Sequence, residues 1–234
     1  MGNWQKYVAE LYGTFVLVGV GTGAMLTAAV TGGGAIEIAI GFGLGLVAAL
    51  YTVGKVSGGH FNPAVSLGMF LDKRISATDL LGYWVSQLAG AALASLALAF
   101  IVSKAAVAST VTSLNTQYVD NLGGVVGEAI LTVVFVMMIL VATKKGSSTT
   151  FVAIGFTLAA VHLVGLGFTG ASVNPARSFG PALVGGEWAD YWIYLVGPLA
   201  GAVVAWVLYK VIVTEDAVIV AEDAKPIDDV REMM

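Results

Sequence analysis

The feature that most constrains this chain is a series of long apolar stretches almost free of charged side chains. They cover residues 11–30, 38–54, 80–103, 121–143 and 191–209, and a further stretch lies within 146–176. A helix that crosses the hydrocarbon core of a bilayer needs about 20 apolar residues. Charged residues make up only 11% of the chain, far below the share typical of soluble domains. The sequence therefore predicts an all-α membrane protein with six transmembrane helices, the fifth of which shares its stretch with an additional segment.

Composition also excludes several classes of function. The chain has no cysteine, which rules out disulfides, thiolate catalysis and cysteine-based metal sites. Its net charge of -4 argues against nucleic acid as a partner. With two histidines and no convergent acid–base set, we expect neither an enzyme nor a metal or cofactor site. We also expect no cleavable signal peptide.

The basic residues predict the orientation in the cell membrane. If both termini are cytoplasmic, nine of the eleven Lys and Arg residues fall on the cytoplasmic side, as the positive-inside rule requires. These nine are Lys6, Lys55, Lys73, Arg74, Lys144, Lys145, Lys210, Lys225 and Arg231. Lys104 and Arg177 fall outside. Residues 1–213 are expected to form one channel-like domain, and residues 214–234 an acidic cytoplasmic tail.

The two halves of the chain resemble each other. Residues 57–66 (SGGHFNPAVS) align with 169–178 (TGASVNPARS), and 87–94 align with 198–205 at nearly the same separation. We take the repeats to cover about 5–104 and 121–213. Each repeat holds three spans, and because three is odd, the second repeat must enter the membrane from the opposite side. Inverted 3+3 repeats of this kind place their functional site near the midplane, where interrupted helices meet.

Each repeat contains an Asn-Pro-Ala motif that reads as the start of a helix. Asn is a favoured N-cap residue, and Pro suits the first helical position. The motifs are Asn62, Pro63 and Ala64 in the first repeat, and Asn174, Pro175 and Ala176 in the second. The helices should end near Leu71 and Leu183, which makes each ~13 Å long at ~1.5 Å per residue. We therefore predict two re-entrant half-helices that meet end to end and together line a water-filled path.

The motif pair, the six spans and the two glutamates in the first helix of each repeat resemble the aquaporin (major intrinsic protein) family over residues 5–212. The resemblance implies a homotetramer with one pore in each subunit. It also implies that the Asn62 and Asn174 amides donate hydrogen bonds to a passing water.

A second group of pore residues follows from the same resemblance. It implies a selectivity filter formed by Phe42, His162, Ala171 and Arg177, with His60 in the inner vestibule. Two alternatives stay open: His162 as a packing histidine, and Arg177 as a surface residue that snorkels. Ala171 departs from the family pattern, in which Cys or Thr is common, and this departure suggests leakage of ammonia or hydrogen peroxide.

Glu10 and Glu128 are carboxylates within apolar helices. We interpret them as structural groups that accept N–H donors from the re-entrant loops, because buried backbone donors need partners. The alternative is a proton relay.

The predicted function is passive, single-file conduction of water with exclusion of protons and ions. Within the family resemblance, His162, Ser178 and the pair Tyr191-Trp192 favour water over glycerol. The alternatives are an aquaglyceroporin-like channel, an ion-coupled transporter with inverted repeats, and an adhesive or scaffold protein with a closed pore.

Overall fold

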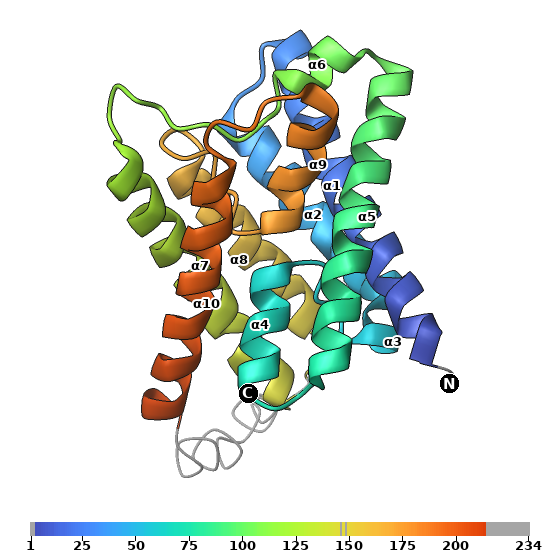
Figure 1. Ribbon diagram of the computed structural model, residues 1–234, viewed down its shortest axis with the longest axis vertical. Coiled ribbons are helices and arrows are strands. Elements are labelled where there is room, and N and C mark those ends of the chain that lie inside the picture. The colour runs from blue at the N-terminus through green and yellow to red at the C-terminus, as the bar shows by residue number, and fades with distance from the viewer. Residues whose placement is uncertain (1–2, 146, 148, 214–234) are drawn as a thin grey trace, which may run out of the picture.

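A computed structural model describes residues 3–145, 147 and 149–213. The predicted tail, 214–234, lies outside the described residues. Within them the chain is helical and has no strand (Figure 1). The elements are α1 (Asn3–Thr31), α2 (Ala35–Ala49), a π-helical turn η1 (Leu50–Gly54), α3 (Lys55–Ser57), α4 (Pro63–Leu71), α5 (Ala77–Ile101), α6 (Lys104–Ala108), α7 (Asn121–Lys145), α8 (Thr150–Gly165), α9 (Pro175–Gly185) and α10 (Tyr191–Ile212).

The predicted inverted repeat is confirmed by the way the helices pack. In the first half α1 contacts α2 and α5, and in the second half α7 contacts α8 and α10. The halves meet through α2 and α8. Each short helix crosses to the other half, because α4 packs against α10 and α9 packs against α5. Figure 1 shows α4 and α9 stacked one above the other in the middle of the bundle.

The spans follow the prediction with one difference in length. Five helices of the described chain are long and apolar enough to cross a membrane, and α2, η1 and α3 form one of them, Ala35–Ser57. The remaining span is α8, the fifth in chain order, which has only 16 residues. Its length is about 24 Å at ~1.5 Å per residue. After Gly165 the chain turns back into the protein instead of extending the helix, as expected for a stretch that holds a helix and an additional segment.

The two half-helices begin at the predicted positions. Asn62 caps α4 by accepting from Ala64 N at 2.8 Å. Asn174 caps α9 by accepting from Ala176 N at 3.0 Å and Arg177 N at 3.2 Å. The first helix ends at Leu71 as predicted. The second continues past Leu183 to Gly185, where Gly186 takes the left-handed conformation (φ 83°) that commonly ends a helix.

Glycines allow the long helices to touch through their backbones. A Cβ at Gly90 would lie 2.2 Å from the carbonyl oxygen of Leu11, where α5 crosses α1. A Cβ at Gly201 would lie 2.5 Å from the carbonyl oxygen of Ala129, where α10 crosses α7. These two crossings follow Glu10 and Glu128 directly, so close helix contact and the buried carboxylates occur at the same level of each half.

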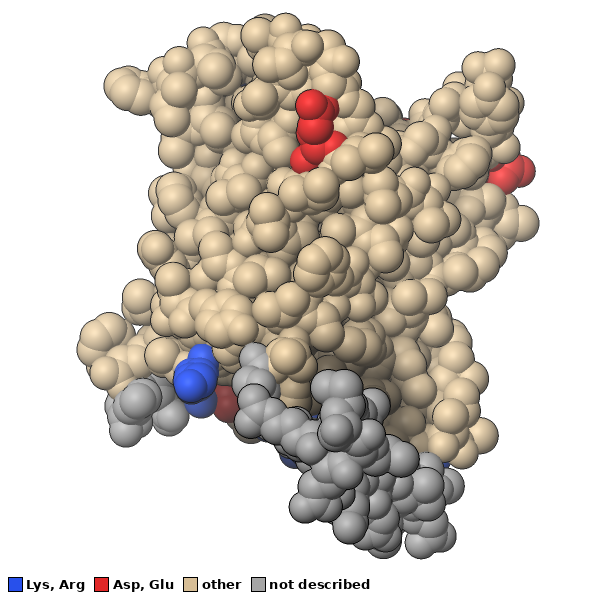
Figure 2. All heavy atoms as spheres, turned by 180° about the vertical axis from the view of Figure 1, so that it is seen from behind, with Lys and Arg blue, Asp and Glu red and all other residues tan. Residues whose placement is uncertain are grey.

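On the face that Figure 2 shows, exposed charged side chains gather at the two ends of the molecule. We call the end where α1 begins and α10 ends the terminal face, and the opposite end the distal face. Figure 2 shows a wide uncharged belt between them. Many apolar side chains in this belt are exposed, including Leu44, Leu81 and Val134. An apolar surface of this extent suits lipid as its solvent.

Candidate functional site: a narrow cavity between the half-helices

The loops that lead into α4 and α9 have the same backbone shape. Both use left-handed φ values at the same three repeat positions, 58, 59 and 61 in the first half and 170, 171 and 173 in the second. Three of these six residues are not glycine: Phe61 (φ 50°), Ala171 (φ 47°) and Val173 (φ 45°). Left-handed backbone is costly for residues with a side chain and persists only where the surroundings hold it in place.

Glu10 holds the first loop. Its Oε1 accepts from Ser57 Oγ at 2.6 Å and from His60 N at 2.9 Å. Its Oε2 accepts from Phe61 N and from Gln87 Nε2, both at 2.7 Å. The carboxylate is fully buried and is surrounded by donors from α5 and from the loop.

Glu128 holds the second loop in the same manner with one donor fewer. Its Oε1 accepts from Thr169 Oγ1 at 2.7 Å and Ser172 N at 2.9 Å. Its Oε2 accepts from Val173 N at 2.7 Å. Both carboxylates are thus committed to loop donors.

The two motif asparagines lock the loops to each other. Asn62 Nδ2 donates to the carbonyl oxygen of Val173 at 2.8 Å, and Asn174 Nδ2 donates to that of Phe61 at 2.9 Å. An amide nitrogen carries two hydrogens. Each asparagine therefore keeps one N–H that no bond among the described residues uses.

A cavity of only about 10 Å³ runs beside these amides. Polar lining comes from both halves and apolar lining from four helices. The residues that line it are Leu17, Phe42, Leu46, His60, Asn62, Phe135, Leu158, His162, Ser172, Asn174 and Arg177. Both motif asparagines and three of the four predicted filter residues therefore share one narrow space.

The filter residues Phe42, His162 and Arg177 lie in direct contact. The Phe42 and His162 rings stack with centroids 4.3 Å apart, and the Arg177 guanidinium lies 4.6 Å from the Phe42 centroid. His162 Nδ1 donates to the carbonyl oxygen of Leu158 at 2.9 Å, so Nε2 is left as an acceptor. His162 Nε2 and Arg177 Nε are both buried without a partner among the described residues.

Ala171 and His60 occupy different positions relative to the cavity. Ala171 is fully buried but is not among the residues that line the cavity. It lies close to Gly165, where an added Cβ would come within 3.1 Å of the Ala171 methyl group. His60 does line the cavity and bonds Ser66 Oγ through Nδ1 at 3.0 Å. The filter set predicted from the sequence is thus brought together except for the Ala171 side chain.

Several site residues were not predicted. Gln87 links Glu10 to Ser66, and Ser172 bonds Ser178 Oγ at 2.6 Å, which is the counterpart of the His60–Ser66 bond in the first half. Met25 Sδ accepts from Arg177 Nη2 at 3.7 Å. The aligned pair Ser66 and Ser178 was a signal for the serines, whereas nothing in the sequence pointed to Met25.

Taken together, the fold and site define a multi-pass membrane protein whose inverted halves enclose a narrow polar passage. Comparison with known proteins agrees. The family described as major intrinsic protein matches residues 1–209. A "Glycerol uptake facilitator protein-like 6" from Lactiplantibacillus plantarum is 38% identical, covering 91% of this chain and 100% of the relative. An "Aquaporin Z" from Brucella melitensis is also 38% identical, covering 91% of this chain and 99% of the relative.

The fold has a close match among solved structures as well. The aquaglyceroporin from Plasmodium falciparum superposes with a TM-score of 0.82 at 24% identity, covering 91% of this chain and 97% of that one. The chain belongs to the major intrinsic protein family. Members of this family are channels, which supports the prediction that the protein is not an enzyme.

Proposed function

We propose that this chain is a passive channel that conducts water in single file and excludes protons and ions. The observation that carries the proposal is that both motif asparagines, His162 and Arg177 line one narrow cavity. Its volume, about 10 Å³, is close to the least that one water molecule needs. Glycerol, with three carbons and three hydroxyls, would have to widen this space further than water to pass.

Unpaired polar atoms give the passing water its hydrogen bonds. A water oxygen that accepts the remaining N–H of Asn62 and that of Asn174 has no lone pair left for its neighbours. A proton cannot then hop along the file. Single water molecules entering the filter meet His162 Nε2 as an acceptor and Arg177 Nε as a donor, two buried atoms that have no hydrogen-bond partner among the described residues.

Fixed positive charge supplies the barrier to cations. The N-termini of α4 and α9 face each other at the asparagines, and each helix end carries roughly +0.5 of an elementary charge. Arg177 adds a full charge at the constriction, where a bare ion would also lose its hydration. Helix dipoles and an arginine are the general explanation for cation exclusion in aquaporin-type pores.

Conduction of glycerol is the second candidate. Two observations favour it: one relative is named a glycerol uptake facilitator-like protein, and Ala171 provides no polar side chain at the filter. An ion-coupled transporter is disfavoured because Glu10 and Glu128, the carboxylates in the middle of the bundle, are engaged by loop donors.

The domain boundaries, the orientation and the assembly are part of the same proposal. Residues 1–213 form the channel, with repeats at about 5–104 and 121–213, and both termini face the cytoplasm. Four copies assemble as a homotetramer, each with its own pore. Because the wild-type chain has no cysteine, single cysteines can be introduced at either face. Labelling them from one side of the membrane tests the orientation directly.

Stopped-flow light scattering on proteoliposomes tests the function. Wild type should shrink far faster than empty vesicles under an impermeant osmolyte and no faster than them in glycerol exchange. His162→Gly should admit glycerol. Leu163→Gly is the matched control, because Leu163 follows on the same helix and is exposed to lipid. Rapid glycerol entry in wild type would favour the second candidate, and equal water permeability of wild type and empty vesicles would refute conduction.

A further inference from the structure

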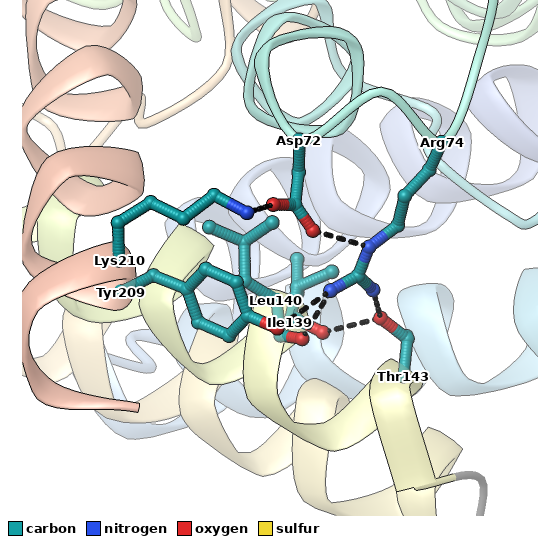
Figure 3. A network of polar contacts seen from close by, with 7 residues as sticks. All are labelled: Asp72, Arg74, Ile139, Leu140, Thr143, Tyr209 and Lys210. Atoms are coloured by element: carbon teal, nitrogen blue, oxygen red, sulfur yellow. Dashed lines mark hydrogen bonds and ion pairs between the residues drawn. The ribbon is translucent and has the colours of Figure 1, made fainter. Parts of the chain in front are cut away.

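Three cations surround one tyrosine ring at the terminal face. The Tyr209 centroid lies 5.8 Å from Arg74 Cζ, 5.9 Å from Lys144 Nζ and 5.4 Å from Lys210 Nζ. They come from three separate elements: the turn after α4, the end of α7 and the end of α10. Figure 3 shows Arg74, Tyr209 and Lys210 around the carboxylate of Asp72.

One carboxylate opposes these three cations. Asp72 Oδ1 pairs with Lys210, and Asp72 Oδ2 lies 2.8 Å from Arg74 Nε. Burial would raise the pKa of Asp72, but the hydrogen bonds from Lys210 and Arg74 lower it below its usual value, so the group stays ionised. In the described part of the chain no other ion pair involves Arg74, Lys144 or Lys210. The cluster therefore carries an excess of two positive charges.

Arg74 is fully used by the protein. Its Nη1 donates to Thr143 Oγ1 at 2.7 Å, and its Nη2 donates to the carbonyl oxygen of Leu140 at 2.8 Å and to Tyr209 Oη at 3.3 Å (Figure 3). The guanidinium thus fastens the end of α4 to α7 and α10. Lys144 is exposed and has no ion pair in the described part of the chain, and Lys210, although paired with Asp72, keeps 52% of its side chain accessible to an outside ligand.

The two ammonium groups belong to one patch of the terminal face. Both lie within 5.9 Å of one ring centroid, so they are less than 12 Å apart. From Lys210, α10 leads back toward the uncharged belt with exposed apolar side chains on the same side of the helix, Val203 and Val207. A ligand with an anionic head and a long apolar body would match both surfaces at once.

We propose that Lys144 and Lys210, held around Tyr209 by the Arg74 network, bind the phosphate of an anionic phospholipid whose acyl chain lies along α10. Basic pockets between transmembrane helices at the headgroup level are suited to such lipids. The like charges that crowd one ring repel each other, and a phosphate relieves this repulsion. The inference requires only that the protein is embedded in a bilayer, so it does not depend on which solute the pore conducts.

Native mass spectrometry of the full chain in detergent tests the site. Dioleoyl phosphatidylglycerol should bind more tightly than dioleoyl phosphatidylcholine. Lys144→Gln should weaken phosphatidylglycerol binding about fivefold, the effect of roughly one lysine near an anionic lipid. Asp72→Asn should strengthen it, because the cluster then gains one positive charge. Lys104→Gln is the matched control at the distal face and should change nothing.

Four outcomes would overturn the proposal. The first is equal binding of the two lipids by wild type, and the second is unchanged affinity in Lys144→Gln. The third concerns a competing anion from the chain itself, since the acidic segment 214–234 follows α10 directly. If Glu215→Gln with Asp216→Asn markedly tightens phosphatidylglycerol binding, the site belongs to that segment. Displacement of the lipid by an equal concentration of inorganic phosphate would likewise assign the site to a soluble anion.

Discussion

At the scale of single residues, the pore is defined by polar atoms that the protein leaves without partners. A buried donor or acceptor with no partner costs about 1–3 kcal/mol. His162 Nε2 and Arg177 Nε are in this position, and each motif asparagine has one N–H to spare. In the proposed function, water in the passage would satisfy these atoms, so the permeant would complete the hydrogen bonding of the site.

Removal of the filter charge should weaken proton exclusion. Arg177→Val is expected to raise proton flux at least about tenfold, which corresponds to ~1.4 kcal/mol of barrier. Water flux should persist, because the asparagines are intact. A pH-sensitive dye inside proteoliposomes measures the proton flux. Lys104→Val removes a cation from the exposed distal face and should have no effect, and proton flux unchanged in Arg177→Val would show that the arginine is not part of the barrier.

The two buried glutamates should be about equally sensitive to amide substitution. In either orientation of the new amide, its NH₂ would face one backbone N–H of the loop: His60 N or Phe61 N in Glu10→Gln, and Ser172 N or Val173 N in Glu128→Gln. Each unsatisfied donor costs about 1–3 kcal/mol. Both variants should therefore melt below wild type in detergent, by similar amounts. No loss in either would contradict a loop-supporting role.

The site residues divide by how far the sequence could predict them. Asn62 and Asn174 could be found because an N-cap followed by proline is a local signal that occurs twice. Ala171 was assigned to the filter by resemblance alone, and its left-handed backbone (φ 47°) and its contact with Gly165 have no local signal in the sequence. The partners of Arg177 depend on how α1 packs, which no local pattern encodes.

At the scale of elements, the architecture depends on two short helices, α4 and α9, that begin in the middle of the protein. The starts of α4 and α9 and the end of α4 agree with the sequence prediction, because proline and the capping asparagine act within a few residues. The π-turn η1, the short α8 and the extended α9 were not predicted. Their lengths depend on loop contacts and on left-handed Gly186, which are tertiary effects.

Close contact between helices should make two glycines sensitive to even one added methyl group. Gly90→Ala and Gly201→Ala place a Cβ 2.2 Å and 2.5 Å from a backbone oxygen of the neighbouring helix, and backbone cannot easily move aside. We expect each to destabilise the fold by about 1–3 kcal/mol, as overpacking does. Thermal unfolding followed by circular dichroism measures the effect.

Gly19→Ala and Gly23→Ala are the matched controls for this experiment. Their Cβ atoms would meet nothing nearer than 3.9 Å and 4.0 Å, and alanine favours a helix over glycine by about 1 kcal/mol. These controls should be neutral or slightly stabilising. Equal effects in all four variants would mean that the contacts at Gly90 and Gly201 are not limiting.

At the scale of the whole molecule, the repeat creates one passage from two incomplete halves. Each half provides one short helix, one asparagine and one supporting glutamate, and neither half encloses the cavity alone. The filter breaks this symmetry, because Arg177 occupies the position that Val65 takes in the first repeat. Selectivity is thus added to a symmetric scaffold by a few residues.

The most direct test of the central claim compares two water permeabilities of the same proteoliposomes. Osmotic permeability is measured by stopped-flow light scattering, and diffusive permeability by exchange of isotopically labelled water. In a single file each molecule can advance only if its neighbours advance with it, so the osmotic value of the wild-type channel should clearly exceed the diffusive one. Equal values would mean that water does not move in single file, and the proposed mechanism of conduction would be wrong.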